Sequence, residues 1–493
     1  CPATFQIHIL MNSSLETYTL SVSERVKNEK AATALIKIVG DLFYDRNVQV
    51  VLYRQPMVDQ RPSEMLQAHV HGSVMAGEVL SINDTLAMAE ALRSSQVQNA
   101  SVDIGRLATE WRREAGIYLH RKAFLESKLQ GFTNADNPNS EPVDVVLYGF
   151  GRIGRLVARE LIAQEGRGTQ LRLRAIVARG DDGLSLEKRA SLLRVDSIHG
   201  HFPGTVDVDH EGKKLVINGR PVAIISASAP EEIDYLNYGI EDALLIDNTG
   251  AFRDRDALAR HENCPGIAKV LLTAPGKGVP NVVFGVNQDM VDPKETIQSA
   301  ASCTTNAIAP VLKVINDAFG IAQGHIETIH AYTNDQNLVD NMHKKYRRGR
   351  AAALNMVITE TGAGEAVDKA IPGLGSKLTS NAIRVPVPNG SLAILKLKLE
   401  RRTDRDGINA ALKAAAFSGP LVQQIKYSVS PELVSSDIVG DSCCAIFDSE
   451  ATLIHTDGTS AVLYVWYDNE YGYTRQVMRL AKHMAGVRRK TYY

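Results

Sequence analysis

Residues 143–161 have the sequence V-D-V-V-L-Y-G-F-G-R-I-G-R-L-V-A-R-E-L, and this stretch decides the fold of the longest part of the chain. A β-rich run ends at Tyr148, three glycines follow at 149, 151 and 154, and apolar residues then recur at helical spacing. In a strand–loop–helix unit the first glycine permits the turn, the second lets a pyrophosphate approach the backbone, and the third lets helix and strand pack. The helix N-terminus then faces the anion. The stretch therefore predicts a dinucleotide-binding loop.

Strand and helix patterns alternate for about 150 residues after this loop, which favours a parallel sheet covered by helices. The better strand candidates are Leu171–Ala178, Ala243–Ile246, Val270–Leu272 and Val282–Phe284. We therefore expect an α/β fold with a Rossmann domain.

The residue that binds the adenine ribose is not obvious. An acidic side chain is usual at the end of the second strand, but Ala178 is followed by Arg179, Gly180 and Asp181. Arg179 would suit the 2′-phosphate of NADP through bidentate hydrogen bonds. Alternatively the chain bulges and Asp181 binds the ribose, with Arg179 a solvated loop residue.

Residues 301–306, A-S-C-T-T-N, precede a helical pattern that ends at Gly320, so Cys303 is expected at a helix N-terminus. Exposed N–H groups there favour an anion and would lower the pKa of the thiol. Residues 326–332, I-E-T-I-H-A-Y, look like a strand that carries His330. A cysteine with a histidine partner, downstream of a dinucleotide loop, indicates a nucleophile and its general base.

The motifs G-F-G-R-I-G-R, S-C-T-T-N, I-H-A-Y-T-N-D-Q and W-Y-D-N-E-Y-G-Y occur in this order, and together they resemble the phosphorylating glyceraldehyde-3-phosphate dehydrogenases. The resemblance runs from about Val143 to about Gly486. It implies a Rossmann domain, an α+β catalytic domain, a homotetramer, and NAD or NADP as cofactor with inorganic phosphate as co-substrate. The N-terminal part resembles only a long-chain bacterial form.

The resemblance also assigns residues one by one. Cys303 matches the catalytic nucleophile and His330 its partner; Thr333 and Arg384 match the residues that hold the substrate's phosphate. The site for attacking phosphate matches Ser302, Thr304, Thr361 and Gly362. The cofactor residues are matched by Gly149, Gly151, Arg152, Ile153, Gly154, Thr273 and Asn469, with Arg179 as the residue in question.

Several positions depart from the family pattern. Tyr148 replaces an Asn, and Glu365 replaces a Lys. Asn341-Met342 replaces the Leu-Pro pair of NAD-selective bacterial members, and the acidic ribose ligand is not in its usual place. The last two departures favour NADP or dual use.

The first 130 or so residues contain no catalytic motif. Residues 5–22 alternate around Asn12-Ser13-Ser14 and suggest a hairpin. From Ser23 the pattern becomes helical, with further helices expected over Ser81–Ser95 and Val102–Gly116. Residues 131–142 form a polar, proline-containing linker. We expect a mainly helical extension (1–135), a NAD(P)-binding domain (143–302, completed by a C-terminal helix 472–493) and a catalytic domain (303–471).

Composition narrows the function. Lys plus Arg is 55 and Asp plus Glu is 56, so no long-range field attracts nucleic acid, despite the basic run K-K-Y-R-R-G-R at 344–350. Five cysteines fit neither a disulfide framework nor a zinc site, so we expect a reducing, cytoplasmic setting and no metal. No apolar run is long enough for a membrane span.

The expected reaction oxidises glyceraldehyde 3-phosphate to 1,3-bisphosphoglycerate through a cysteine thioester. One alternative is erythrose-4-phosphate dehydrogenase, a relative that hydrolyses the thioester. Another is a binding or scaffold protein that acts through the N-terminal helices.

Overall fold

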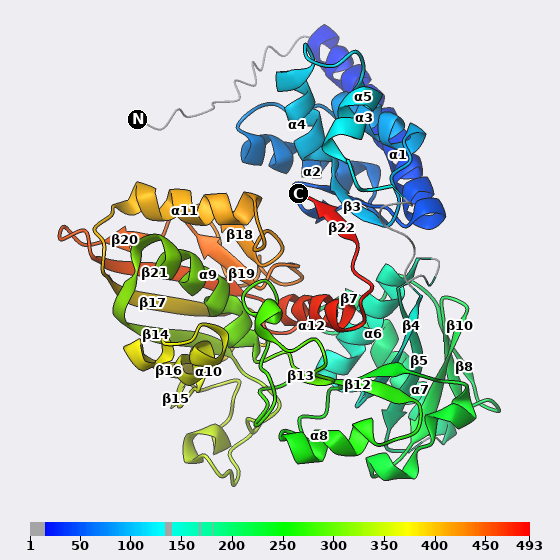
Figure 1. Cartoon of the computed structure of the whole chain (residues 1–493), viewed down its shortest axis with the longest axis vertical. Coiled ribbons are helices and arrows are strands. Elements are labelled where there is room, and N and C mark those ends of the chain that lie inside the picture. Colours follow the sequence, from blue (N-terminus) through cyan, green and yellow to red (C-terminus); the bar gives the residue numbers. More distant parts are fainter. Residues whose placement is uncertain (1–14, 134–140, 167, 169, 181) are drawn as a thin grey trace. The chain divides into compact units, whose positions relative to one another are not determined.

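The computed structural model describes residues 15–133, 141–166, 168, 170–180 and 182–493 (Figure 1). These residues form two compact units, which are described separately. The smaller unit, called the N-terminal unit, contains residues 15–133 together with Arg489–Tyr493. The larger unit contains residues 141–488.

The N-terminal unit packs helices around a small sheet in the order β2-β1-β3-β22. Strands β1, β3 and β22 are parallel to one another, and β2 is antiparallel to β1. The helices are α1 (Leu15–Arg46), α2 (Pro62–Ala76), α3 (Ile82–Ser94), α4 (Ile104–Glu114) and α5 (Arg121–Lys128). The strands are β1 (Gln49–Leu52), β2 (Gln55–Pro56), β3 (Ala100–Asp103) and β22 (Lys490–Tyr492).

The hairpin expected over residues 5–22 is wrong for the residues that the structure describes, and its first half lies outside them. Residues 15–22 begin the long helix α1. The alternating Tyr18, Leu20 and Val22 are exposed, so their alternation does not mark a buried face. Further along α1, Leu35, Val39 and Leu42 are buried at helical spacing. Because elongating an existing helix is much easier than nucleating one, the buried half supports the exposed half.

The helices expected near Ser81 and Val102 are present with adjusted ends. Ser81 is the N-cap of α3, and its hydroxyl accepts a hydrogen bond from the Asn83 amide. α4 starts two residues late because Ala100–Asp103 is a strand, and Asp103 caps the helix by accepting from the Arg106 amide. A strand this short has too few residues to show a period.

The larger unit begins with an eight-stranded sheet in the order β13-β12-β11-β4-β5-β10-β9-β8. The first six strands run parallel, and β9 and β8 are antiparallel additions. The parallel strands are β4 (Val143–Tyr148), β5 (Leu171–Ala178), β10 (Arg220–Ser226), β11 (Ala243–Asp247), β12 (Ile267–Leu272) and β13 (Ile297–Ser299); the others are β8 (Val206–Asp209) and β9 (Lys214–Ile217). The accompanying helices are α6 (Arg152–Glu165), α7 (Gly183–Arg194) and α8 (Arg255–Glu262), and β6 (Val195–Asp196) pairs with β7 (Gly200–His201).

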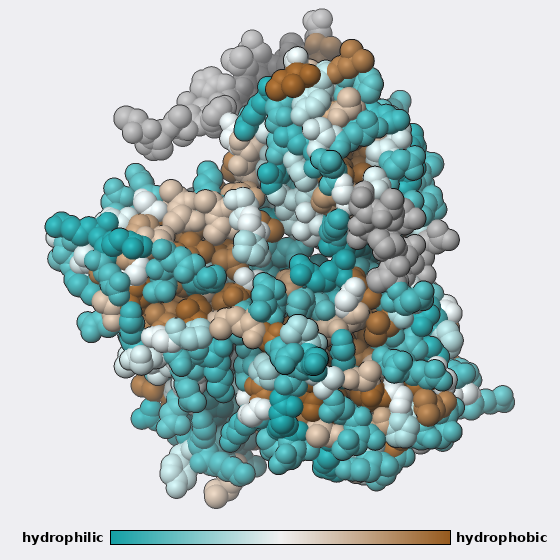
Figure 2. All heavy atoms as spheres, in the orientation of Figure 1, coloured by the Kyte–Doolittle hydropathy of each residue, from teal (hydrophilic) through white to brown (hydrophobic). Residues whose placement is uncertain are grey.

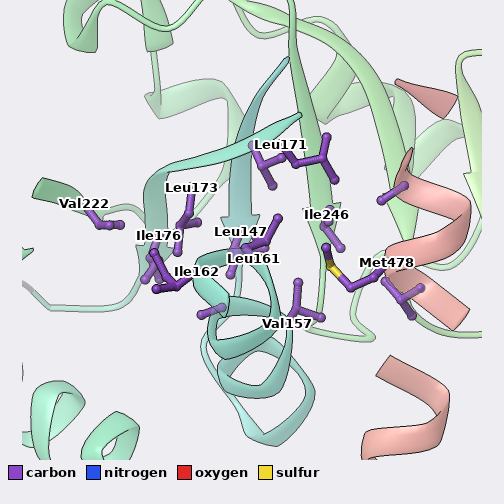
Figure 3. Packing of buried hydrophobic residues seen from close by; sticks show 14 of the residues in the cluster. Leu147, Val157, Leu161, Ile162, Leu171, Leu173, Ile176, Val222, Ile246 and Met478 are labelled. Atoms are coloured by element: carbon purple, nitrogen blue, oxygen red, sulfur yellow. The ribbon is translucent and has the colours of Figure 1, made fainter. Parts of the chain in front are cut away.

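Apolar side chains cover both faces of this parallel sheet, as its continuous hydrophobic strands predict. On one face Leu147 and Ile246 pack against Val157 and Leu161 of α6 and Met478 of the C-terminal helix (Figure 3). On the other face Val146 and Leu245 pack against Leu258 of α8, in a separate cluster.

The strand expected at Val282–Phe284 is wrong. These three residues are buried, but they lie in a loop between the isolated bridge at Asn281 and a turn. The outer strand of the sheet is β13, Ile297–Ser299. The run is apolar because the loop is packed inside the protein, not because it pairs in the sheet.

A second, mixed sheet carries the catalytic part, in the order β15-β16-β14-β17-β21-β19-β18. Helices α9 and α11 pack one face of it, where Leu395 and Val465 contact the helical cluster. The strands are β14 (Ile321–Ala331), β15 (Val357–Thr359), β16 (Leu378–Val385), β17 (Ser391–Leu399), β18 (Ile425–Ser428), β19 (Ala445–Asp448), β20 (Leu453–Ile454) and β21 (Ser460–Tyr467). The helices are α9 (Cys303–Phe319), α10 (Ala363–Ala370) and α11 (Arg405–Phe417).

The C-terminal helix is shorter than the expected 472–493. Helix α12 spans Tyr471–Met484 and packs against α6. Gly486, at φ +71, is in the left-handed region that terminates helices. The last residues then leave the larger unit and form β22 in the N-terminal unit. Short 3₁₀ turns complete the fold at Pro230–Glu232, Tyr235–Tyr238, Gln288–Met290, Tyr346–Gly349 and Gly375–Lys377.

Candidate active site

Cys303 is the first residue of α9, where the sequence places it. Ser302 is the N-cap, and its hydroxyl accepts a hydrogen bond of 3.0 Å from the Thr305 amide. Ala301, just before the cap, has φ +55, an uncommon left-handed conformation for a residue with a side chain. The Tyr473 hydroxyl donates to the Ala301 carbonyl at 3.0 Å and the Ser299 hydroxyl accepts from its amide. Strain that is held in place by such contacts is typical of functional sites.

His330 faces this helix start from strand β14. Its Nε2 lies 3.6 Å from Cys303 Sγ. Thr328 and His330 are buried on the face of β14 that carries Ile326, as the two-residue period of a strand requires. The Tyr467 ring packs edge-on against the imidazole, and its hydroxyl lies 3.1 Å from Thr304 Oγ1. The structure thus brings the expected nucleophile and base into contact.

Arg384 lies on the far side of the imidazole. Its Nη1 donates to the Ala331 carbonyl at 2.8 Å and to Thr333 Oγ1 at 3.3 Å, and lies 3.0 Å from His330 Nδ1. His330 Nδ1 is itself 2.7 Å from the Ala331 carbonyl. We assign the proton of the neutral imidazole to Nδ1, because two N–H groups can share this carbonyl. Nε2 then presents a lone pair to Cys303, as a base must.

The surroundings favour neutral forms of both groups. Burial, and to a smaller extent the nearby Arg384 cation, lower the pKa of His330 to about 3. Burial also raises the pKa of the Cys303 thiol, while Arg384 opposes that rise. The expectation of a lowered thiol pKa is therefore wrong for this state of the site, since desolvation of the thiolate outweighs the nearby cation.

The glycine loop has the geometry that its sequence requires. Gly149 has φ +95, and a Cβ on it would meet Thr249 Cγ2 at 2.8 Å. A Cβ on Gly154 would meet the Gly149 carbonyl oxygen at 2.4 Å. A Cβ on Gly151 would meet nothing within 4 Å, so open space lies beside the backbone at the start of α6. This is the space that a pyrophosphate needs.

A buried pair that the sequence analysis missed supports the neighbouring loop. His261 Nε2 lies 3.1 Å from Asp247 Oδ2, and both side chains are 0% exposed. Asp247 Oδ1 accepts from the amide and hydroxyl of Thr249, both at 2.7 Å. The His261 ring lies edge-on against Tyr148 at 4.5 Å between centroids. Tyr148, the departure before G-F-G, therefore packs beside this pair.

One cavity of about 890 Å³ joins the two halves of the site. Its lining includes residues of both the glycine loop and the nucleophile centre. Among the expected residues it contains Gly151, Arg152, Ile153, Thr273, Ser302, Cys303, His330, Thr333 and Asn469. A more open hollow of about 1070 Å³ lies along β14, β17 and β21, and the described residues that line it include no cysteine.

Some expected residues do not line the cavity. Gly149 packs against Thr249, Gly154 packs against the Gly149 carbonyl, and Thr304 is buried against Tyr467. Thr361 and Gly362 lie just before α10, with Gly362 as its N-cap. Arg384 contacts His330 and Thr333 from the side.

Other residues in the cavity already have partners. Arg152 makes ion pairs with Glu470 and Asp196. Asn469 is buried, and its Oδ1 accepts from the Ser391 hydroxyl at 2.9 Å, which leaves its amide nitrogen as a donor. Arg348, which the sequence analysis did not assign, lines the cavity and pairs with Asp335. It lies in the basic run 344–350.

The end of β5 narrows the choice of ribose ligand. The strand stops at Ala178, and Arg179 is exposed just beyond it. Asp182 accepts from the Ser185 amide and hydroxyl as the N-cap of α7. Asp181 lies outside the described residues.

Family comparisons agree with this architecture. Residues 143–255 match the model described as the NAD-binding domain of glyceraldehyde 3-phosphate dehydrogenase, and residues 302–469 match its C-terminal domain. A Pseudomonas aeruginosa protein described as glyceraldehyde-3-phosphate dehydrogenase-like is 47% identical over 457 residues, which cover 92% of this chain and 98% of that protein.

The chain belongs to the glyceraldehyde-3-phosphate dehydrogenase family.

Two shorter family members cover a smaller share of this chain. A glyceraldehyde-3-phosphate dehydrogenase of Streptococcus pyogenes is 41% identical and covers 70% of this chain with 99% of its own length. One from Kluyveromyces marxianus is 40% identical and covers 70% with its whole length. The P. aeruginosa relative covers much more of the chain, so it shares most of the N-terminal unit.

The family establishes a dehydrogenase with an NAD-binding Rossmann domain. Among the described residues, no three His, Cys, Asp or Glu side chains are grouped so as to hold a metal ion. No helix in the described part of the chain is long and apolar enough to cross a membrane.

Proposed function

We propose that this protein oxidises glyceraldehyde 3-phosphate to 1,3-bisphosphoglycerate, reversibly, through a thioester on Cys303. The observation that carries the proposal is the 3.6 Å contact between Cys303 Sγ and His330 Nε2 in a cavity shared with the glycine loop. A nucleophile, a base and a dinucleotide loop in one cavity are the parts that aldehyde oxidation needs.

The chemistry follows from the neutral pair. Cys303 Sγ attacks the aldehyde carbon, and the thiol proton passes through His330 Nε2 to the carbonyl oxygen, giving a hemithioacetal. His330 then takes the hydroxyl proton as the carbon is oxidised to the thioester. The bound cofactor supplies the hydride acceptor for this step. Inorganic phosphate attacks the thioester carbon, and Cys303 leaves as the thiolate.

Two phosphates have to be held. Arg384 Nη1 lies 3.3 Å from Thr333 Oγ1, next to the imidazole. We propose that these two residues bind the phosphate of the substrate. We assign the attacking phosphate to the hydroxyls and amides of Ser302, Thr304, Thr361 and Gly362. Arg348 lines the same cavity, and we propose it as a further cation for these phosphates.

The cofactor is NAD or NADP, and we propose that NADP is used. The loop has room for the pyrophosphate beside Gly151, and Asn469 offers an amide donor. At the adenine ribose, β5 ends at Ala178 rather than at a carboxylate, and Asp182 already caps α7. Arg179 is then the charged group that would meet a 2′-phosphate.

A homo-oligomer, expected to be a tetramer, is part of the proposal. On the face of β17 and β21 opposite the helices, Leu392, Ile394, Val462, Tyr464 and Trp466 are half-buried. Figure 2 shows apolar side chains gathered over this part of the catalytic sheet. A second copy would cover such a face, because exposed apolar patches of this kind mark protein interfaces. We place the enzyme in the cytoplasm, where its thiol stays reduced.

Initial rates of cofactor reduction test this proposal. Glyceraldehyde 3-phosphate is supplied with NAD or NADP, with and without inorganic phosphate, to the wild type and to Cys303→Ser. We expect a phosphate-dependent rate that Cys303→Ser abolishes. A phosphate-independent rate with erythrose 4-phosphate as substrate would instead support the alternative of a hydrolysing erythrose-4-phosphate dehydrogenase. Absence of turnover by folded protein would refute the proposed enzymatic activity.

A further inference from the structure

The last residues of the chain form an edge strand of the N-terminal unit. Strand β22 pairs in parallel with β3, with Lys490 opposite Ala100, Thr491 opposite Ser101 and Tyr492 opposite Val102. The sheet order β2-β1-β3-β22 places this segment at the outer edge. An extended peptide added to a sheet edge is a common mode of peptide recognition.

Arg489 is the best-buried polar anchor of this segment. Its side chain lies over the Phe43 ring, and the residue is only 9% exposed. Nε donates to both the carbonyl oxygen and Oδ1 of Asn47 at 3.1 Å, and Nη2 also donates to Oδ1. Burial lowers the pKa of Arg489 to about 10, so the guanidinium is still charged at neutral pH.

The acceptors of Arg489 belong to a socket that we define as Asn47 and Asn99. Both residues are buried, and both have left-handed backbones, with φ +56 and φ +51. Asn47 Nδ2 donates to Asn99 Oδ1 at 3.1 Å, and the Asn99 carbonyl accepts from the Lys490 amide at 3.3 Å. Asn adopts this backbone conformation more readily than most residues, and here the carbonyl oxygens of both residues accept from the segment Arg489–Lys490.

The other end of the segment is held by its two tyrosines. The Tyr493 hydroxyl lies 2.7 Å from Ser101 Oγ. The Tyr492 hydroxyl donates to Glu110, and Arg106 lies over the Tyr492 ring. The side chain of Lys490, by contrast, is exposed, and its Nζ donates to the Gly131 carbonyl. The N-terminal unit therefore contacts the side chains of Arg489 and the two tyrosines through specific polar groups, whereas the Lys490 side chain lies at the surface.

We propose that the N-terminal unit is a peptide-binding module whose ligand is the chain's own C-terminal pentapeptide, Arg489–Tyr493. The Asn47–Asn99 socket recognises the guanidinium, the edge of β3 recognises the backbone, and the polar groups beyond it recognise the tyrosines. This inference does not depend on the proposed reaction.

The test separates the ligand from the module after folding. A full-length variant carries a specific protease site between Arg488 and Arg489; it is purified, cut and freed of the released peptide. A fluorophore-labelled peptide Arg-Lys-Thr-Tyr-Tyr is then titrated and followed by anisotropy. We expect saturable binding to the cut protein and none to the uncut protein, in which the site is filled.

Matched peptides test the contacts. Replacing the residue that corresponds to Arg489 with Ala should weaken binding at least about tenfold, as loss of charged hydrogen bonds to a buried site does. The same replacement at Lys490 should change binding less than about threefold, because surface contacts contribute little. Equal binding of the two peptides, tight binding to the uncut chain, or no binding to the folded, cut protein would overturn the proposal.

A second measurement covers the case in which the cut protein precipitates. Amide hydrogen exchange of full-length Arg489→Ala and Lys490→Ala is compared along β3. Loss of protection at the Ser101 amide, the residue opposite Thr491, in Arg489→Ala alone supports the module. Equal protection in both variants contradicts it.

Discussion

Arg384 and His330 share one acceptor, the carbonyl oxygen of Ala331, with Arg384 Nη1 2.8 Å and His330 Nδ1 2.7 Å from it. Because of this arrangement a permanent cation lies against the imidazole that faces Cys303. The cation disfavours imidazolium and favours thiolate, so it acts on both members of the pair.

The depressed pKa of His330 makes stability depend on pH. The unfolded histidine binds a proton near pH 6.5, whereas the folded one does so only near pH 3. Between these values the unfolded state binds more protons, so the free energy of unfolding falls as the pH falls, by about 1.4 kcal/mol per unit at most. From pH 6.5 to 4.5 the wild type should lose about 2–3 kcal/mol more than His330→Asn. Denaturant unfolding of both proteins measures this difference, with the exposed His201→Asn as a histidine control. Parallel losses in wild type and His330→Asn would contradict the assignment.

Arg384 should matter for the phosphate of the substrate. We expect Arg384→Met to lower kcat/KM for glyceraldehyde 3-phosphate by about 10–100-fold, since a charged hydrogen bond contributes about 1.5–3 kcal/mol. With unphosphorylated glyceraldehyde the loss should be much smaller, and the exposed Arg402→Met should have no effect. An equal loss with both aldehydes would show that Arg384 acts on His330 rather than by binding the substrate's phosphate.

Two glycines of the loop should separate folding from cofactor binding. Gly154→Ala places a Cβ against the Gly149 carbonyl and should destabilise the protein by about 1–3 kcal/mol. Gly151→Ala meets no neighbour and has φ −77, so it should fold normally but bind NAD more weakly, because its methyl group occupies the space of the pyrophosphate. Thermal unfolding and titration of NADH fluorescence measure the two effects. Normal stability of Gly154→Ala would contradict the packing account.

Arg179 should distinguish the two cofactors. Arg179→Ala should raise the KM for NADP about tenfold, because an exposed arginine that forms one phosphate contact contributes about 1.5 kcal/mol. The KM for NAD should change less than about threefold, since NAD has no 2′-phosphate. Initial rates at saturating aldehyde measure both constants. Equal changes in KM for the two cofactors would contradict a contact with the 2′-phosphate and indicate that Arg179 is a solvated loop residue.

The sequence predicted those parts of the molecule whose residues carry a local signal. The glycine loop and β4 were predicted because strand, turn and helix signals follow one another, and Cys303 was placed because its helix pattern begins at a Ser cap. The pairing of Cys303 with His330 was predicted because both motifs follow the dinucleotide loop in the sequence.

Longer-range features gave no such signal. Strand β22 has three residues and its partner β3 lies near the other end of the chain, so nothing near Lys490 predicts the pairing. The direction of the Cys303 pKa depends on burial, which the order of residues does not show. The Asp247–His261 pair joins the end of a strand to a helix. Arg348 was part of a basic run that was weighed only as a nucleic-acid patch, although it lines the cavity.

The covalent role of Cys303 is tested most directly by intact-protein mass spectrometry. The enzyme is mixed with glyceraldehyde 3-phosphate and the preferred cofactor without phosphate, and is quenched in acid. The account predicts one added phosphoglyceroyl group, located on Cys303 by peptide mapping, lost on addition of phosphate and absent in Cys303→Ser. An unmodified wild type that nevertheless reduces the cofactor, or a Cys303→Ser variant with the wild-type rate, would contradict it.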